Sequence, residues 1–203
     1  MNDYDYLINQ LSLLIGLIDV SEEEVYNQIK HHDQYALGIT IEQLYEGQYS
    51  NYSNHITTAA YVLGFAHIED FITKCITRIL IAYPNTNEWK VTIKTIQEKG
   101  DGLITYIAEE QSKRLTFSDK IKFIEKNIQG IDAQILFEIK LSNDIRNCIM
   151  HNNGIADNRL SPKYPIGEKI VLTAWEINNY GLRARQFANE VWQKISSISI
   201  TSV

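Results

Sequence analysis

The stretch ITTAAYVLGFAHIEDFITKCITRILIAY, residues 56–83, is the longest segment of this 203-residue sequence in which apolar residues recur at helical spacing. Its apolar residues fall three or four positions apart, so they form a stripe along one side of a helix. The stripe consists of Tyr61, Phe65, Ile68, Ile72, Cys75, Ile79 and Tyr83. We therefore expect a long helix that packs this stripe into the core of the fold.

Glu69 is the charged residue that does not fit the apolar character of this segment. It lies in a row beside the stripe, and the other members of that row are almost all apolar. Since an unpaired charge in an apolar environment is costly, the carboxylate needs a partner. That partner belongs either to an ordinary ion pair at the helix edge or to a functional site.

Helical periodicity continues on both sides of residues 56–83. The predicted segments are Tyr4–Asp19, a second helix opened by the Ser21–Glu24 capping box, Trp89–Glu98, Leu103–Lys113, a short helix capped by Ser118, a helix from Asp132 to Asn152, and a last helix from about Ala174. The last helix places Ile177, Gly181, Ala184, Ala188, Val191 and Ile195 on one face.

Breaks between these segments are expected where turn-forming residues gather. They fall at residues 45–54, 84–87 and 100–102 and at Gly130, and residues 161–172 are expected to form a loop or small hairpin before the last helix. Neither an internal repeat nor a linker interrupts the pattern. The sequence therefore predicts an all-α bundle in one domain, residues 1–203, with a core at about residues 56–195.

The composition excludes several classes of protein. Hydrophobic residues make up 44% of the chain, and only 3 prolines and 10 glycines are present, which favours long uninterrupted helices. No apolar run approaches the roughly 18–20 residues of a membrane span, and the polar start MNDYDY does not resemble a signal peptide. Cys75 and Cys148 lie in helical patterns without CxxC spacing, so we expect reduced core thiols. These features predict a cytoplasmic protein without a membrane segment.

Charge and histidine spacing limit what the chain binds. The net charge of −6 opposes broad nucleic-acid binding, because non-specific affinity depends on many Lys and Arg contacts to phosphates. Any RNA must therefore be bound at a small local site or with the help of a partner. His31 and His32 are adjacent and point to different sides of a helix, so we expect neither a metal site nor a cofactor.

The stretch DIRNCIMHNNGIAD, residues 144–157, carries the strongest functional signal. At about 100° per residue, Arg146 and His151 are separated by roughly 140° around a helix and flank a polar strip that contains Asn143 and Asn147. One helix does not easily close both side chains on a single phosphate. Two copies related by a two-fold axis would pool two arginines and two histidines, which predicts a homodimer.

The residue types at these positions suit phosphate chemistry. His151 lies in the last turn of its helix, where the terminal carbonyls favour an imidazolium, and histidine transfers protons near neutral pH. The fork-shaped guanidinium of Arg146 suits a phosphate oxygen. These groups support metal-independent RNA cleavage by the ribose 2′-hydroxyl. The alternative is structural: Arg146 pairs with an acid such as Glu69, while His151 and the asparagines cap the helix.

The motif Arg146-Asn147-Cys148-Ile149-Met150-His151 resembles the signature of HEPN domains, in which an arginine, a polar residue and three further residues precede a histidine. The following Asn152-Asn153-Gly154 is similar to the HNNG ending of stand-alone bacterial members, including the group associated with RNA-ligase-like and phosphoesterase systems. HIEDFI (67–72) resembles the early-helix glutamate of the family, and KYPIGEKIVLT (163–173) resembles the loop before its closing helix. By helix order the resemblance covers about residues 56–195, although only the Arg–His motif is specific.

The resemblance implies an all-α bundle, a dimer whose facing motifs build one site, and ribonuclease activity in toxin–antitoxin or phage-defence systems, with an antitoxin or defence protein as partner. Other members of the family are non-catalytic partners, so a dimerising interaction module is the alternative function. Asn153 stands where one variant of the family carries a tyrosine that a nucleotidyltransferase modifies, so that mode of regulation is not expected.

These arguments give one set of candidate site residues. Arg146 and His151 are the expected catalytic residues, and Asn147, Glu69, Asn143 and Asn152 are the expected supporting residues. We also expect Glu69 to approach Arg146 within salt-bridge distance, since a carboxylate in an apolar row needs a fixed cation.

Overall fold

Helix α3 (Ser50–Ala82) contains the long apolar stripe and is the longest helix of the fold. The computed structural model describes residues 2–31, 50–84, 91–161 and 163–197. Every stripe residue from Tyr61 to Ile79 is buried, whereas Tyr83, one residue beyond the end of the helix, is exposed. The spacing therefore predicted both the helix and the side of it that packs.

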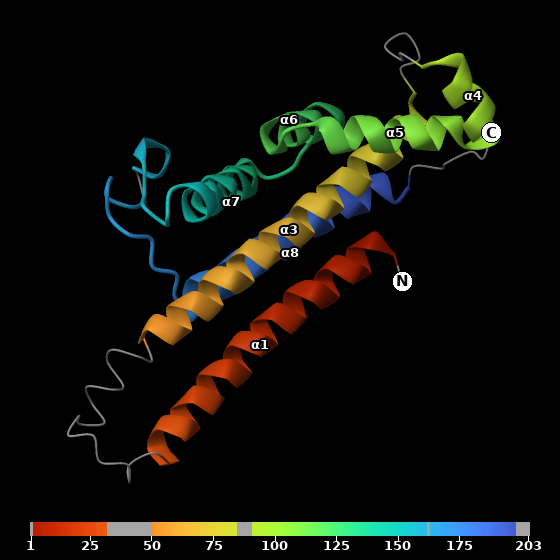
Figure 1. Cartoon of the computed structure of the whole chain (residues 1–203). Helices are drawn as coiled ribbons and strands as arrows, with labels where there is room; N and C mark the ends of the chain where they lie inside the picture. Colours follow the sequence, from red (N-terminus) through yellow and green to blue (C-terminus); the bar gives the residue numbers. More distant parts are fainter. Residues whose placement is uncertain (1, 32–49, 85–90, 162, 198–203) are drawn as a thin grey trace. The chain divides into compact units, whose positions relative to one another are not determined.

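The described part of the chain is all-α, as the sequence predicts. Its further helices are α1 (Asp3–His31), α4 (Ile93–Lys99), α5 (Leu103–Arg114), α6 (Phe117–Asn127), α7 (Ala133–His151) and α8 (Ala174–Ile195), drawn in Figure 1. Two 3-10 turns, η3 (Gly100–Gly102) and η4 (Asn158–Leu160), complete the elements. In the described residues no strand is formed, and none of their helices combines the length and apolar character needed to cross a membrane.

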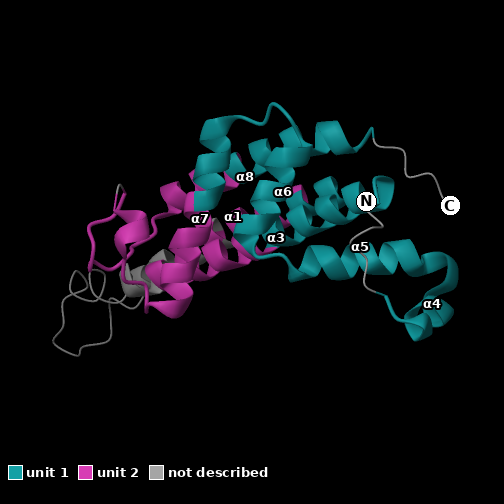
Figure 2. Ribbon diagram, turned by 90° about the horizontal axis from the view of Figure 1, so that it is seen from above, with its two compact units in different colours: residues 1–7, 67–140, 183–203 teal, residues 8–66, 141–182 magenta. Residues whose placement is uncertain are grey.

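The chain divides into two compact units (Figure 2). Unit 1 comprises Met1–Leu7, His67–Lys140 and Arg183–Val203, and unit 2 comprises Ile8–Ala66 and Leu141–Leu182. Helices α1, α3, α7 and α8 each contribute residues to both units. Each unit is therefore assembled from segments far apart in the sequence.

The core of unit 1 is built from α3, α5, α6, α7 and α8. Its fully buried large side chains include Phe71, Ile72, Ile76, Ile121, Ile124, Ile135, Ile139 and Phe187. Polar contacts tie the same helices together: Thr77 and Ser112 share a hydrogen bond of 2.7 Å between α3 and α5, and Arg183 Nε lies 2.9 Å from Glu138 Oε2 between α8 and α7. Apolar burial supplies the main stabilisation, and these pairs fix the register of the helices.

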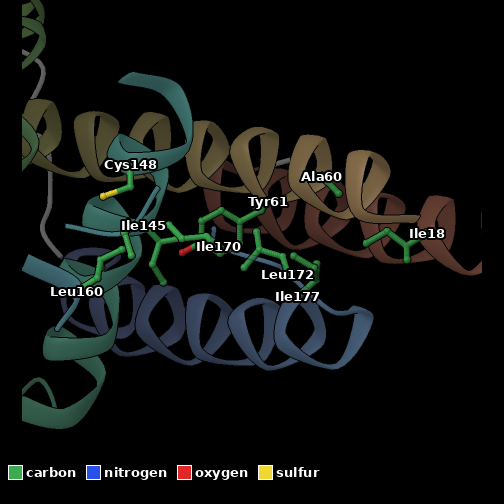
Figure 3. Packing of buried hydrophobic residues seen from close by; sticks show 10 residues of the cluster. Ile18, Ala60, Tyr61, Ile145, Cys148, Leu160, Ile170, Leu172 and Ile177 are labelled. Atoms are coloured by element: carbon green, nitrogen blue, oxygen red, sulfur yellow. The ribbon is translucent and has the colours of Figure 1, made fainter. Parts of the chain in front are cut away.

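The core of unit 2 gathers apolar residues from α1, α3, α7, α8 and the α7–α8 connection (Figure 3). Its buried members are Ile18, Ala60, Tyr61, Ile145, Cys148, Ala156, Leu160, Ile170, Leu172 and Ile177. The Tyr61 hydroxyl donates a hydrogen bond of 3.2 Å to the Ser142 carbonyl, which joins α3 to α7. This core holds the last two turns of α7, and with them the Arg146–His151 motif.

Several predictions from the local sequence are confirmed. Asp132 caps α7, since its Oδ1 accepts from the backbone N–H groups of Gln134 and Ile135 at 2.7 and 3.1 Å. Helix α8 begins at Ala174, and the whole predicted face from Ile177 to Ile195 is buried. The residues expected to form a loop or small hairpin fold back on the end of α7 through an antiparallel bridge between Ile155 and Lys169.

Other boundaries were wrong. Helix α1 runs through Ser21 to His31 as one helix, because residues 17–25 contain no glycine or proline to end the first segment. Helix α3 begins at Ser50, inside the predicted loop 45–54, since a polar sequence marks exposure and does not by itself prevent a helix. Residues 45–49 and Trp89, at the start of another predicted helix, lie outside the described residues.

The cap of α6 was also misplaced. Thr116, and not Ser118, is the N-cap: its Oγ1 accepts from the Asp119 N–H at 3.2 Å, and its backbone is extended. Phe117, the first helical residue, is buried, so core packing starts the helix two residues earlier than the serine would.

Candidate functional site

The candidate site lies at the C-terminal end of α7, in unit 2. Ile145 and Cys148 face the core and are buried, whereas Arg146 and Asn147 are half-buried and His151 is exposed. The apolar residues thus anchor this part of the helix and leave the arginine and the histidine outside the core. This is the arrangement that the spacing of the motif predicts.

Arg146 is held by neutral partners. Its Nη1 donates a hydrogen bond of 3.0 Å to Asn147 Oδ1, and its guanidinium carbon lies 5.8 Å from the centroid of the buried Phe65 ring on α3. Within the described residues of unit 2, no carboxylate lies at ion-pair distance from this guanidinium. The amide and the ring orient the side chain but do not neutralise its charge.

Glu69 has a cationic partner, but it is a different one from the arginine we expected. Lys120 Nζ donates a hydrogen bond of 2.8 Å to Glu69 Oε1, and both residues belong to unit 1. Arg146 belongs to unit 2. The partner of Glu69 within unit 1 is therefore Lys120, which lies 51 positions away in the sequence and is brought there only by the packing of α6 on α3.

His151 is the last residue of α7, and the turn after it is fixed by backbone hydrogen bonds. The N–H groups of Asn152 and Gly154 both donate to the Cys148 carbonyl at 3.0 Å. Asn153 and Gly154 adopt positive φ angles of 52° and 75°, which ends the helix as the Asn-Gly sequence predicts. The imidazole is thus exposed next to a hydrogen-bonded turn.

The expected supporting asparagines have different surroundings. Asn147 is the acceptor for Arg146, and Asn143 lies half-buried one turn earlier on α7. Asn152 Nδ2 donates a hydrogen bond of 2.7 Å to the Ile155 carbonyl. Asn152 therefore stabilises the turn after His151, whereas Asn147 contacts the arginine directly.

Sequence reasoning missed Arg159, which lies in η4 and packs on α7. Its Nη2 lies 2.6 Å from Asp157 Oδ2, its Nη1 lies 3.9 Å from Asp144 Oδ1, and its Nη2 lies 3.9 Å from Cys148 Sγ. The hydrogen bonds from Arg159 lower the pKa of Asp157 to about 2, and those same bonds raise the pKa of Arg159.

Asp144, Cys148 and His151 follow one another at spacings of four and three, so they share one side of α7. Arg159 is therefore placed on the side of the helix that also carries His151, and it is already paired with an acid. Burial raises the pKa of Asp144, the other acid of this group. The spacing of residues in the sequence does not predict this cluster, because the cluster forms only when the α7–α8 connection folds back onto α7.

The start of α8 is fixed by a reciprocal capping box. The Thr173 N–H donates to Glu176 Oε2 at 3.0 Å, and the Glu176 N–H donates to Thr173 Oγ1 at 3.3 Å. The Tyr164 hydroxyl donates to Glu176 Oε1 at 3.0 Å, which ties the connection to α8. The connection between α7 and α8 is thus held by hydrogen bonds at both of its ends.

No protein-family model, no curated protein and no solved structure matches this chain. The resemblance to HEPN domains therefore rests on the quoted residues alone.

Proposed function

We propose that this chain is a HEPN-like, metal-independent endoribonuclease in which Arg146 binds the scissile phosphate and His151 transfers protons. The observation that carries the proposal is the environment of Arg146. Its guanidinium has an amide and an aromatic ring as neighbours, and in the described part of unit 2 no acid neutralises it. A cation in that state is available to a phosphate, and His151 is exposed at the end of the same helix.

The proposed reaction needs a nucleophile that the substrate itself supplies. The ribose 2′-oxygen attacks the adjacent phosphorus, a new O2′–P bond forms, and the P–O5′ bond breaks. A neutral histidine accepts the 2′-hydroxyl proton, and a protonated histidine gives a proton to the departing 5′-oxygen. Arg146 offsets the negative charge that develops on the phosphate oxygens. The products carry a 2′,3′-cyclic phosphate and a 5′-hydroxyl.

We propose a homodimer as the active form. The separation of roughly 140° between Arg146 and His151 on one helix favours a site that two copies complete together, and one histidine from each copy would then serve as base and acid. The proposed setting is the cytoplasm, in a toxin–antitoxin or phage-defence system with a partner protein. The net charge of −6 accords with RNA bound at this local site and not along an extended basic surface.

The experiment is RNA cleavage by the purified full chain in the presence of a chelator. We expect cellular RNA to be cut to fragments with 2′,3′-cyclic phosphate ends and DNA of the same sequence to survive, because DNA lacks the 2′-hydroxyl. Cleavage that the His151→Ala variant performs as fast as the wild type would refute the proposal. Intact RNA after incubation with concentrated dimer would do so as well.

A second candidate function is a non-catalytic dimerising module, and one observation favours it. Arg146 packs against the buried ring of Phe65 and is half-buried, so it contributes to the structure of unit 2 whether or not it binds phosphate. The same assay separates the two functions, since the module predicts a stable dimer that leaves RNA intact.

A further inference from the structure

Helix α4 packs with its polar side toward its neighbour. None of its residues is buried, and its isoleucines face outward, with Ile93 76% and Ile96 48% exposed. Thr95, together with the cap residue Thr92, instead lines a cavity of about 370 Å³ between α4 and α5. An amphipathic helix ordinarily turns its apolar side chains to its neighbour. The side chains that line this space are mostly polar: they are Thr92, Thr95, Tyr106, Glu110, Gln111 and Arg114, with Val91 and Ile107 as the apolar members.

Helix α5 presents an ordered row of side chains to the same cavity. Tyr106, Glu110 and Arg114 line it at spacings of four residues, and Gln111 lies beside Glu110. Each step of four residues advances about 6 Å along a helix. An aromatic ring, a carboxylate and a guanidinium thus follow one another along one wall, and the buried Ile107 lies on the same wall.

We propose that this cavity binds a nucleoside monophosphate. The base stacks on Tyr106, the carboxylate of Glu110 accepts from the ribose hydroxyls, and Arg114 binds the phosphate. The order of base, sugar and phosphate in the ligand matches the order of the side chains along α5. The volume of about 370 Å³ falls within the range of small-molecule sites.

The charged side chains around the cavity are compatible with a bound phosphate. Arg114 Nη2 lies 3.5 Å from Glu110 Oε2, and its side chain is 80% exposed. An exposed pair of this kind is weak, so a phosphate can replace the carboxylate as the partner of Arg114. Lys99 Nζ lies over the Tyr106 ring, 4.5 Å from its centroid, so the base stacks on the opposite face of the ring.

The site is independent of the proposed nuclease function. All of its residues belong to unit 1, and neither Arg146 nor His151 takes part in it. Binding is therefore measured without any RNA cleavage, and a failure of one proposal does not entail a failure of the other.

The test is calorimetric titration of the full chain with AMP, GMP, CMP and UMP in turn, and with adenosine as the ligand that lacks a phosphate. We expect saturable binding of monophosphates and weaker binding of adenosine. Tyr106→Ala should weaken both AMP and adenosine by about 5- to 150-fold, the loss expected for a stacked base. Arg114→Ala should weaken AMP by about tenfold or more and leave adenosine unchanged.

The controls separate binding from folding. Tyr83→Ala removes an exposed tyrosine of unit 1 outside this cavity and should leave AMP binding unchanged. If Tyr106→Ala unfolds, as circular dichroism would show, the comparison of AMP with adenosine in the exposed Arg114→Ala variant decides. The proposal is overturned if none of the four monophosphates binds with a dissociation constant below about 1 mM. It is also overturned if Arg114→Ala weakens AMP and adenosine equally.

Discussion

Lys120 Nζ lies 2.8 Å from Glu69 Oε1, and the lysine is the buried member of the pair, with 6% of its side chain exposed against 33% for the glutamate. A buried ammonium without a counter-ion is more costly than a carboxylate that water still reaches. The contact joins α6 to α3 inside unit 1 and accounts for the one charged residue in the apolar row of α3.

Removing the carboxylate should therefore destabilise the fold more than removing the ammonium. We expect Glu69→Gln to lower the free energy of unfolding by about 1–3 kcal/mol, and Lys120→Met to cost less, because methionine suits an apolar site. Urea unfolding of both variants and of the double variant measures the coupling. A larger loss for Lys120→Met than for Glu69→Gln would contradict the argument.

The N-cap of α6 can be tested by comparing substitutions of Thr116 and Ser118. Thr116→Ala removes the acceptor for the Asp119 N–H and should lower the free energy of unfolding by about 1 kcal/mol. Ser118→Ala changes an exposed residue inside the helix and should cost nothing measurable or stabilise slightly, since alanine favours helices. Equal losses for the two variants in thermal unfolding would argue against the observed cap.

The histidine at the end of α7 should be essential for RNA cleavage. His151→Ala should reduce the rate by about 10²–10⁴-fold, the usual contribution of general acid–base catalysis. His55→Ala is the matched control, because His55 is also an exposed histidine of unit 2, and it should cleave like the wild type. Initial rates on a labelled RNA measure both variants.

A mixed dimer tests whether two copies complete one site. We expect Arg146→Ala and His151→Ala to be inactive separately and to recover a small part of the cleavage rate when unfolded and refolded together, since the mixed dimer carries one intact arginine and one of the two histidines. Asn147→Ala should be milder, because an amide orients Arg146 but carries no charge. A monomer by light scattering at micromolar concentration would rule out the shared site, and a mixture that stays inactive would show that the copies do not complement each other.

The Asp157–Arg159 pair should persist to low pH. The hydrogen bonds from Arg159 hold the pKa of Asp157 at about 2, below the ordinary carboxyl pKa of about 3.9. Because this folded-state pKa is lowered, the stabilisation is fully present above about pH 3.9 and is lost as the pH falls through about 2.

Carboxyl NMR should show this titration midpoint in the wild type and a higher midpoint in Arg159→Gln. Arg183→Gln, which removes an arginine paired with Glu138 elsewhere, should leave the midpoint unchanged. A wild-type midpoint near the ordinary value would show that the pair does not form in solution.

The amino-acid sequence by itself determined the features that depend on neighbours within a turn or two. The apolar spacing of α3 and α8 identified which faces are buried, because packing side chains recur with the period of the helix. Asp132 and the Asn153–Gly154 stop were identified because a cap and a left-handed turn are local hydrogen-bonding problems. The positions of Arg146 and His151 outside the core follow from the same periodicity.

Only the tertiary structure decided which distant groups meet. Lys120 reaches Glu69 across 51 positions, and Arg159 meets Asp144 and Cys148 because the α7–α8 connection folds back onto α7. Core packing also overruled local signals, since the buried Phe117 starts α6 ahead of the serine that resembles a cap. The outward isoleucines of α4 and its polar cavity follow from the same cause: spacing defines the faces of a helix, and only its packed neighbours determine which face is covered.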